Sequence, residues 1–338
     1  MNKIIITIFA LALTGIFLAF FAFEGVQPEK VLSISNHTNK QQIQADVNVP
    51  VTAVNKITDF ENKAPVKILF GGDMMFDRYI RQSNESRGYD YAVRDMKELF
   101  DANDCVVANL EGPVTDNDSV SIGSEFGSPD NYKFTFDKAV VQILNDNNFC
   151  VVNIGNNHIG NFGAEGIAQT KEFVSAGGVQ YFGDAGTENK QRYFIQDFNG
   201  VKIAFVNYNQ FTKNALAHTL EDIKKVKNEG GFIVVYTHWG EEYKTTFRKN
   251  EQDIAHHFID AGADVIIGSH PHVVQESEIY KGKTIYYSLG NFVFDQYFSE
   301  ETKKGLLVEA TFDSNDDAIT FAEHDIQLTP SGNTLLIR

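Results

Sequence analysis

Short apolar runs alternate with segments of helical periodicity along most of this chain. Short apolar runs bounded by Gly or polar residues are typical of buried strands, and apolar residues spaced three and four apart are typical of helices. The pattern predicts strands at 66–70, 104–110, 150–154, 192–198, 202–207, 232–237, 265–267, 276–280, 284–289, 305–312 and 318–327. It predicts helices at 89–100, 137–147, 164–176, 219–228 and 252–261.

The order of these elements indicates the fold class. Strands and helices alternate first, and consecutive strands follow, so we expect an α/β (α+β) fold with a mixed sheet covered by helices and antiparallel strands late in the chain. Two hairpins are predicted, one turning at Asn199-Gly200 and one over Lys281-Gly282-Lys283.

The N-terminus carries a different pattern. After Lys3 come 20 uncharged, mostly apolar residues at 4–23, long enough to span a bilayer as a helix. No clear small-x-small cleavage site follows, which favours an uncleaved signal anchor over a cleaved secretory signal. Lys3 places the N-terminus inside, so the body would lie outside the cytoplasmic membrane. We expect an anchor at 1–26, a polar linker at 27–65 and a single large domain at 66–330.

Net charge and cysteine content limit the kinds of ligand and compartment that suit this chain. The 338 residues carry a formal net charge of -16, which argues against nucleic acid as a ligand because nucleic acid selects for basic surfaces. The two cysteines, Cys105 and Cys150, each open an apolar run. A disulfide is possible in an oxidising compartment, but the pattern favours two small buried residues.

The stretch at 263–275, ADVIIGSHPHVVQ, holds the first candidate for chemistry. His270 and His272 follow an apolar strand and flank Pro271, which favours extended backbone at His270. Residues two apart on extended chain point the same way, so both imidazoles can face one point and form half of a metal site. The alternative is two loop histidines with ordinary hydrogen bonds.

Polar residues follow the other strands at the same structural place. In open α/β sheets, sites collect beyond the carboxyl ends of strands. Nitrogen and oxygen ligands of this kind suit Zn, Mn or Fe better than Ca, and the set is large enough for one or two divalent ions. The residues concerned are Asp73, Asn109, Glu111, Asn157, His158 and His238.

Six motifs carry a family resemblance between Val66 and Gln327. They are, in order, GGDMMFDR, NLEGPVT, GNNHIGNFG, THWGEEY, GSHPHVVQ and SLGNFVFD. They resemble the motifs of the CapA capsule-synthesis family, which is linked to poly-γ-glutamate and is similar in turn to calcineurin-like metallophosphoesterases. The resemblance implies a two-sheet β-sandwich flanked by helices.

The resemblance also implies roles for individual residues. Glu111 would stand in for a bridging carboxylate, and His158 would be the acid beside the leaving group. Met75 stands where metallophosphoesterases have the histidine of a D-x-H motif, and Asn161 stands where the family usually has an aspartate that could orient His158. The implied metal positions are Asp73, Asn157, His238, His270 and His272.

Further residues near these motifs have two interpretations each. Arg78 could bind a substrate carboxylate or phosphate bidentately, or be a solvated loop charge. Trp239 and Tyr243 could line a substrate groove or pack at the edge of the sheet. Asn291 could contact substrate or make a tight turn, and we expect the amide of Asn109 to contact substrate.

The predicted anchor and the resemblance together indicate a membrane-anchored extracytoplasmic protein that acts on, or helps to build, an acidic surface polymer such as poly-γ-glutamate. A metal-dependent hydrolase or transferase is the leading interpretation, with a role for membrane synthase subunits as partners. One alternative is a non-catalytic component that holds the polymer or scaffolds the synthase. Another is an ordinary phosphoesterase.

Overall fold

Two β-sheets and the helices around them account for residues 63–183 and 191–337, which the computed structural model describes. The predicted anchor at 1–26 and the linker up to residue 62 lie outside the described residues. Among the residues described, no helix has the length and apolar character needed to cross a membrane.

The first sheet runs in the order β14-β13-β12-β1-β2-β3-β4, and β11 also pairs with β1. Strands β1 to β4 are parallel, whereas β12 to β14 are antiparallel. The strands are β1 (Val66–Met74), β2 (Cys105–Leu110), β3 (Phe149–Asn153), β4 (Gln180–Phe182), β11 (Asn291–Val293), β12 (Lys304–Asp313), β13 (Ala318–Leu328) and β14 (Thr334–Leu336).

The second sheet runs in the order β5-β6-β7-β8-β10-β9. Its inner strands are parallel, and two antiparallel hairpins close its ends. Asn199 and Lys281 both have positive φ, each followed by a glycine, which confirms the two predicted turns. The strands are β5 (Tyr193–Phe198), β6 (Val201–Asn209), β7 (Phe232–His238), β8 (Val265–Ser269), β9 (Ser277–Tyr280) and β10 (Lys283–Tyr286).

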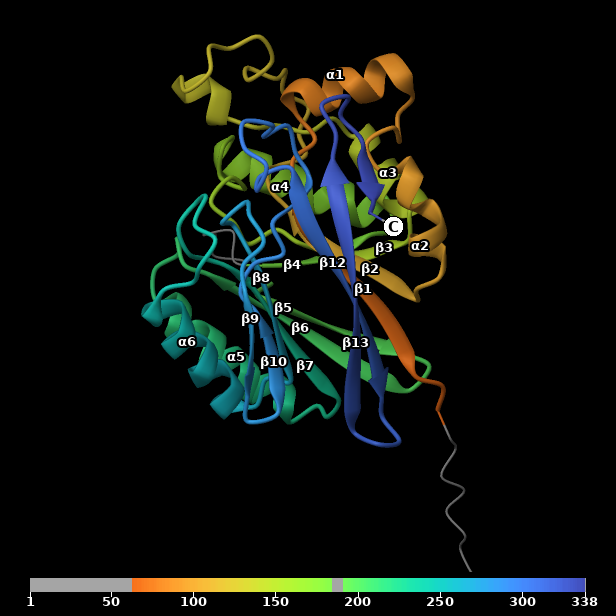
Figure 1. The fold of residues 1–338 in the computed structure, drawn as a ribbon, viewed down its shortest axis with the longest axis vertical. Coiled ribbons are helices and arrows are strands. Elements are labelled where there is room, and N and C mark those ends of the chain that lie inside the picture. Colours follow the sequence, from red (N-terminus) through yellow and green to blue (C-terminus); the bar gives the residue numbers. More distant parts are fainter. Residues whose placement is uncertain (1–62, 184–190, 338) are drawn as a thin grey trace, which may run out of the picture. The chain divides into compact units, whose positions relative to one another are not determined.

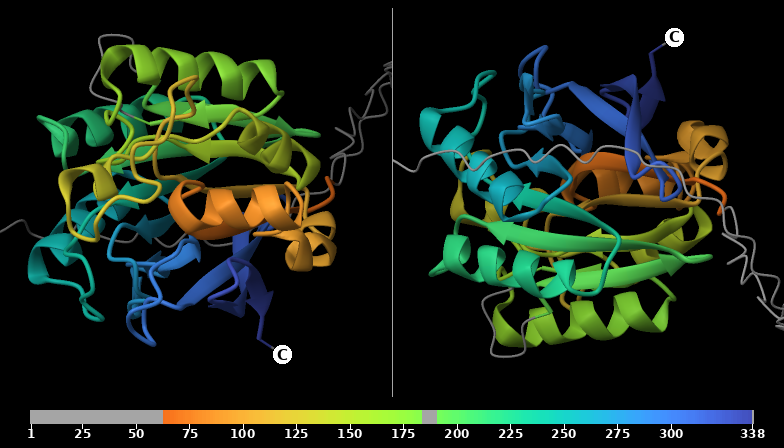
Figure 2. Two further views of the ribbon diagram at one scale, coloured as in Figure 1. Left: turned by 90° about the horizontal axis from the view of Figure 1, so that it is seen from above. Right: turned by 90° about the horizontal axis from the view of Figure 1, so that it is seen from below.

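Helices cover the outer face of each sheet, so the expected two-sheet sandwich flanked by helices is confirmed. Figure 1 shows α5 and α6 against the second sheet at the lower left, and α1 to α4 in the upper half beside the first sheet. Seen from above and from below, strands of both sheets lie between helices (Figure 2). The helices are α1 (Arg78–Arg87), α2 (Lys97–Asp101), α3 (Ala139–Asp146), α4 (Gly163–Ala176), α5 (Ala215–Lys227) and α6 (Lys249–Ala261).

The apolar runs of the central strands are explained by two buried faces. In β8, Val265 and Ile267 join the core between the sheets, while Ile266 packs beneath the outer helices. In β1, Phe70 faces the other sheet and Leu69 faces the helices. A strand buried on both faces reads as a continuous apolar run because successive side chains point to opposite sides.

The cysteines differ from expectation. Cys105 and Cys150 form a disulfide, with their Cα atoms 5.4 Å apart, so the preference for two unpaired core residues is wrong. They lie at the starts of β2 and β3, which are neighbours in the sheet, with Val106 paired to Phe149. The bond therefore fastens together two strands whose other ends carry polar side chains.

One close approach brings β1 to the bend before β11. A Cβ at Gly72 would lie 1.9 Å from the carbonyl oxygen of Gly290, so no larger residue fits there. The amide of Asp73 donates to that oxygen at 3.0 Å, and Asp73 pairs in register with Asn291. Polar residues from distant parts of the chain thus meet at the end of β1.

Candidate metal centre

The ends of β1, β2, β7 and β8 bring acidic and imidazole side chains into one buried cluster. Two overlapping groups have ligand atoms within 4.8 Å of one another, which is close enough to share an ion. One group contains Glu111, His270 and His272, and the other contains Asp73, Glu111 and His238. All five side chains are buried, so their polar atoms need partners inside the protein.

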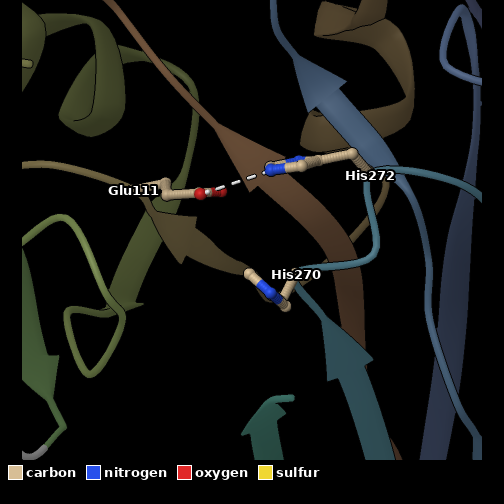
Figure 3. A group of neighbouring side chains, drawn as sticks. All are labelled: Glu111, His270 and His272. Carbon is tan, nitrogen blue, oxygen red and sulfur yellow. Dashed lines mark ion pairs between the residues drawn. The ribbon is translucent and has the colours of Figure 1, made fainter. Parts of the chain in front are cut away.

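We call Glu111, His270 and His272 the open group, because it contains buried polar atoms without partners. Figure 3 shows Glu111 and His272 pointing toward each other, with Oε1 and Nε2 3.6 Å apart, and His270 beside them. Neither carboxylate oxygen of Glu111 has a hydrogen-bond partner among the described residues, and neither does Nδ1 of His270. Burial, followed by the charge of Asp73, raises the pKa of Glu111 well above its ordinary value.

The two histidines reach this group by an unexpected backbone route. His270 and His272 have φ of 97° and 58°, so the predicted extended geometry is wrong, although the prediction that both rings face one site is confirmed. Left-handed backbone is unfavourable for such residues and persists only when the surroundings hold it. Here the amide of His270 donates to Oδ2 of Asp73 at 2.9 Å, and the amide of Tyr243 donates to the carbonyl of Pro271.

Asn291 orients His272. Its Oδ1 lies 3.0 Å from Nδ1 of His272, so Nδ1–H donates to it and Nε2 is left to face Glu111. The Asn291 amide nitrogen donates to Gln296 and to the carbonyl of Thr302. The side chain is fully buried, so it positions the ligand His272. The substrate contact considered for Asn291 from the sequence does not fit this position.

We call Asp73, Asn109 and His238 the closed group, because each of its side chains is hydrogen-bonded. Nδ2 of Asn109 donates to Oδ1 of Asp73 at 2.8 Å, and Oδ1 of Asn109 accepts from Asn153 and Asn156. Asn109 is fully buried, so it too is a positioning residue and not the substrate contact that the sequence predicts. Burial opposes ionisation of Asp73, but the hydrogen bonds from His272 and Asn109 outweigh it and lower the pKa of Asp73.

His238 is held from both ring nitrogens. Nε2 lies 2.8 Å from Oδ1 of Asn157, which can only accept, so Nε2 carries the proton. Nδ1 lies 3.2 Å from Nδ2 of Asn109 and 3.1 Å from Oγ of Ser269. Burial, then the charge of His270, lowers the pKa of His238 well below its ordinary value. Asn157, predicted as a metal ligand through its amide oxygen, places that oxygen on His238.

His158 lies at the edge of the open group. Its Nε2 is 3.9 Å from Oε1 of Glu111, and its ring stacks on Phe134 with centroids 4.4 Å apart. Nδ1 lies 3.2 Å from Oδ1 of Asn161, so an amide oxygen orients this ring in place of a carboxylate. Burial lowers the pKa of His158 to about 4, against the raising effect of that hydrogen bond.

Met75 is not a candidate ligand in this arrangement. Its side chain is fully buried in the core between the first sheet and the helices, and Sδ accepts from the amide of Asp77 at 3.1 Å. Asp77 in turn caps α1, and its other oxygen accepts from the amide of Thr135. This buried aspartate was not singled out from the sequence.

Two of the expected substrate residues have other partners. One Nη of Arg78 bonds to Asp295 and the other lies 3.3 Å from the carbonyl of Asn131, so its guanidinium is not free for bidentate capture of an anion. Trp239 is 1% exposed, and its indole N–H donates to the carbonyl of Tyr287. It packs between the second sheet and the helices and cannot line a groove. Tyr243 does face solvent, with its ring 6.1 Å from that of His272.

The residues that the sequence did not single out are mostly the partners of the ligands. Their only signal is position, because Asn153 ends β3 and Ser269 ends β8, the same place from which the ligands emerge. These partners are Asp77, Asn153, Asn156, Ser269, Asp295 and Gln296.

The open group fits a divalent transition metal ion. It offers a carboxylate and two imidazoles, and neither the oxygens of Glu111 nor Nδ1 of His270 has a hydrogen-bond partner among the described residues. A buried carboxylate without hydrogen bonds is costly unless a cation meets it. These donors suit Zn, Mn or Fe.

Comparison with known proteins assigns the chain to a family. The model described as "Bacterial capsule synthesis protein PGA_cap" matches residues 67–296. The chain belongs to this family. The PGA_cap match spans all members of the open and closed groups.

The chain is also similar to two curated proteins and to one solved structure. The PGA biosynthesis protein CapA of Bacillus subtilis is 31% identical over 71% of this chain and 66% of its own length. The capsule biosynthesis protein CapA of Bacillus anthracis is 32% identical over 73% of this chain and 64% of its own length. The chain thus spans just under two thirds of these relatives. A phosphatase structure from Mycoplasma pneumoniae aligns with a TM-score of 0.49 and 15% identity, covering 78% of this chain and 94% of that one.

Proposed function

We propose that this protein acts in the biosynthesis of an acidic surface polymer such as poly-γ-glutamate, as a metal-dependent hydrolase or transferase. Family membership and the names of the two Bacillus relatives support the polymer class. The observation that carries the chemistry is the buried carboxylate of Glu111, which has no hydrogen-bond partner among the described residues and faces two imidazoles. Such an arrangement is costly for a protein that binds nothing there.

Glu111, His270 and His272 would hold the ion, with the closed group and Asn157 beside them. A bound divalent ion supplies Lewis acidity toward a carbonyl or phosphoryl oxygen and favours ionisation of water. Asn291 keeps Nε2 of His272 turned to the site. The substrate's own negative charge would meet the ion, because the acidic chain offers little other attraction for a polyanion.

His158 would transfer the proton. Asn161 fixes its ring so that Nε2 faces the open group, where a leaving group or water would lie. Burial keeps the imidazole neutral at neutral pH, and an anionic substrate nearby would favour the protonated form. With substrate bound, the protonated ring would donate its Nε2 proton to the leaving group and return to the neutral form.

We further propose that the body lies outside the cytoplasmic membrane, anchored by residues 1–26, where it would meet membrane synthase subunits. The Cys105–Cys150 disulfide supports this location, since disulfides form and persist in oxidising compartments.

A second candidate is a non-catalytic component that holds the polymer. Asn161 favours it, because an amide oxygen at Nδ1 of His158 stabilises a protonated ring less than a carboxylate would, and a neutral imidazole is a weak acid catalyst. In this case the ion would bind polymer carboxylates without turnover.

Metal content and polymer turnover of matched variants test the proposal. Full-length protein in detergent, purified with Zn, Mn and Fe supplied, should carry an ion and change the chain length of poly-γ-glutamate. We expect the His270→Ala, His272→Ala double variant to lose both properties, and His158→Ala to keep the ion while turnover falls by about 10²–10⁴-fold. His324→Ala, remote from the site in β13, is the control.

Three results would change this assignment. A wild-type protein without metal, or a double variant that keeps it, would contradict the metal centre. Loss of metal from His158→Ala would make His158 a ligand. A metal-loaded protein that binds the polymer without altering it would favour the non-catalytic component.

A further inference from the structure

A pocket of about 470 Å³ opens beside the metal centre, and aromatic rings form much of its wall. Phe126 is 79% exposed and Phe298 is 56% exposed, while Tyr132 and Tyr243 are partly exposed. The rings of Tyr243 and Phe298 meet edge to face, with centroids 5.1 Å apart. Large aromatic rings that are exposed together around a concave surface are typical of a ligand-binding site.

The polar groups of the pocket are planar and offer both donors and acceptors. Arg78 and Asp295 form an ion pair on its wall, and Asn131 and Gln296 add amides. Gln296 is fixed from both ends, since Oε1 accepts from Asn291 and Nε2 donates to the hydroxyl of Tyr243 at 3.2 Å. This combination of fixed planar groups suits a ligand that has many hydroxyl or amide groups of its own.

The charge of the pocket excludes a polyanion as its natural ligand. Arg78 is the one cation among the lining residues, and Asp295 neutralises it. Glu242, which lies against Tyr243, adds negative charge nearby. A poly-γ-glutamate segment would bring further carboxylates to a pocket whose described lining residues offer no unpaired positive charge.

We propose that this pocket binds a neutral glycan, a chain of uncharged sugar residues. The C–H faces of sugar rings pack on aromatic side chains, and sugar hydroxyls bond to planar side chains such as the four described above. The volume lies within the range of about 300–1,000 Å³ found for sites of small ligands. The exposed rings of Phe126 and Phe298 allow the chain of sugars to continue past the pocket.

The glycan would lie next to the metal centre. The ring of Tyr243 is 6.1 Å from that of His272, and the guanidinium of Arg78 lies 5.0 Å over Phe134, which stacks on His158. A neutral glycan and an ion in the open group could therefore be held side by side. The proposal does not depend on the polymer chemistry proposed above, because the two sites use different residues.

Calorimetric titration of the full-length protein with neutral oligosaccharides tests this inference. The probes are six-residue β-1,4-linked oligomers of N-acetylglucosamine and of glucose, with a poly-γ-glutamate fragment as the acidic comparison. We expect at least one neutral probe to bind, with affinity unchanged between low and high salt because no net charge is involved. The Phe126→Ala, Phe298→Ala double variant should bind at least about tenfold more weakly, given the worth of two ring contacts.

Tyr89→Ala, which removes a partly exposed ring elsewhere, is the matched control and should bind as the wild type does. Metal content is measured for each protein, so failure of the metal centre is seen separately. Absence of binding by both neutral probes would overturn the proposal. Unchanged binding of the neutral probes by the double variant would also overturn it. So would binding of poly-γ-glutamate by the wild type and the control that the double variant loses.

Discussion

The closed and open groups lie within one cluster, yet they differ in how their polar atoms are satisfied. In the closed group, Asn109 bonds to Asp73 and approaches His238, and its own oxygen accepts two further amides. In the open group, both oxygens of Glu111 lack hydrogen-bond partners among the residues described. The closed group therefore forms a rigid frame, and the open group forms the face that binds. Changes to the frame should cost stability, and changes to the face should cost binding.

The largest expected effect concerns the disulfide that ties β2 to β3, the strands that carry Asn109 and Asn153. Replacing Cys105 and Cys150 by Ala should lower the free energy of unfolding by about 4 kcal/mol, because the bond closes a loop with a sequence separation of 45. Urea denaturation measures this loss. Wild type treated with a reductant should match the variant, whereas free thiols in untreated protein would show that the bond is absent.

The next effect concerns the frame itself. Asn109→Ala leaves Oδ1 of Asp73 without its donor and removes an acceptor from two buried amides. We expect the metal-free protein to lose about 3 kcal/mol of stability, since each unsatisfied buried group costs about 1–3 kcal/mol. Asn117→Ala, at an exposed position, should change stability by less than about 0.5 kcal/mol. Equal stability of the two variants would mean that the hydrogen bonds of Asn109 do not stabilise the fold.

A smaller effect should follow from loosening one ligand. Asn291→Ala removes the acceptor that holds Nδ1–H of His272, so the ring is free to turn away from Glu111. We expect metal affinity to fall by about 10–100-fold, the usual worth of a partner that orients a ligand. Competition with a chromophoric chelator measures it. Asn291→Asp keeps an acceptor and should retain most of the affinity; if it behaves like Asn291→Ala, orientation is not the role of Asn291.

Much of the fold could be predicted because it depends on local pattern. The run at 265–267 predicted β8 and the turn residues predicted both hairpins. Helix α1 was missed because its sequence, RYIRQSNESR, is polar and has little apolar periodicity. The predicted helix at 89–100 forms only its last part as α2, after a 3₁₀ turn at Arg94–Met96. The disulfide was misjudged because it depends on which strands are neighbours, which local pattern does not contain.

The site could be predicted in part for the same reason. The candidates placed at strand ends, Asp73, Glu111 and three histidines, lie together in the structure. The direction of a side chain beyond a strand end depends on tertiary contacts, so Trp239, one residue beyond β7, turned into the core. Asn109 precedes the end of β2 and is therefore enclosed by its neighbours.

The central claim is that Glu111 belongs to a binding face and not to the frame, and Glu111→Gln tests it most directly. The amide of the replacement can donate to the unprotonated ring nitrogens nearby, so the metal-free variant should be more stable than metal-free wild type by about 1–2 kcal/mol. Saturating metal should reverse the order, because only the carboxylate binds the ion well. Thermal unfolding of both proteins with and without added Zn or Mn measures this crossing. A variant that is less stable than wild type in both conditions, or wild type that metal does not stabilise, would contradict the account.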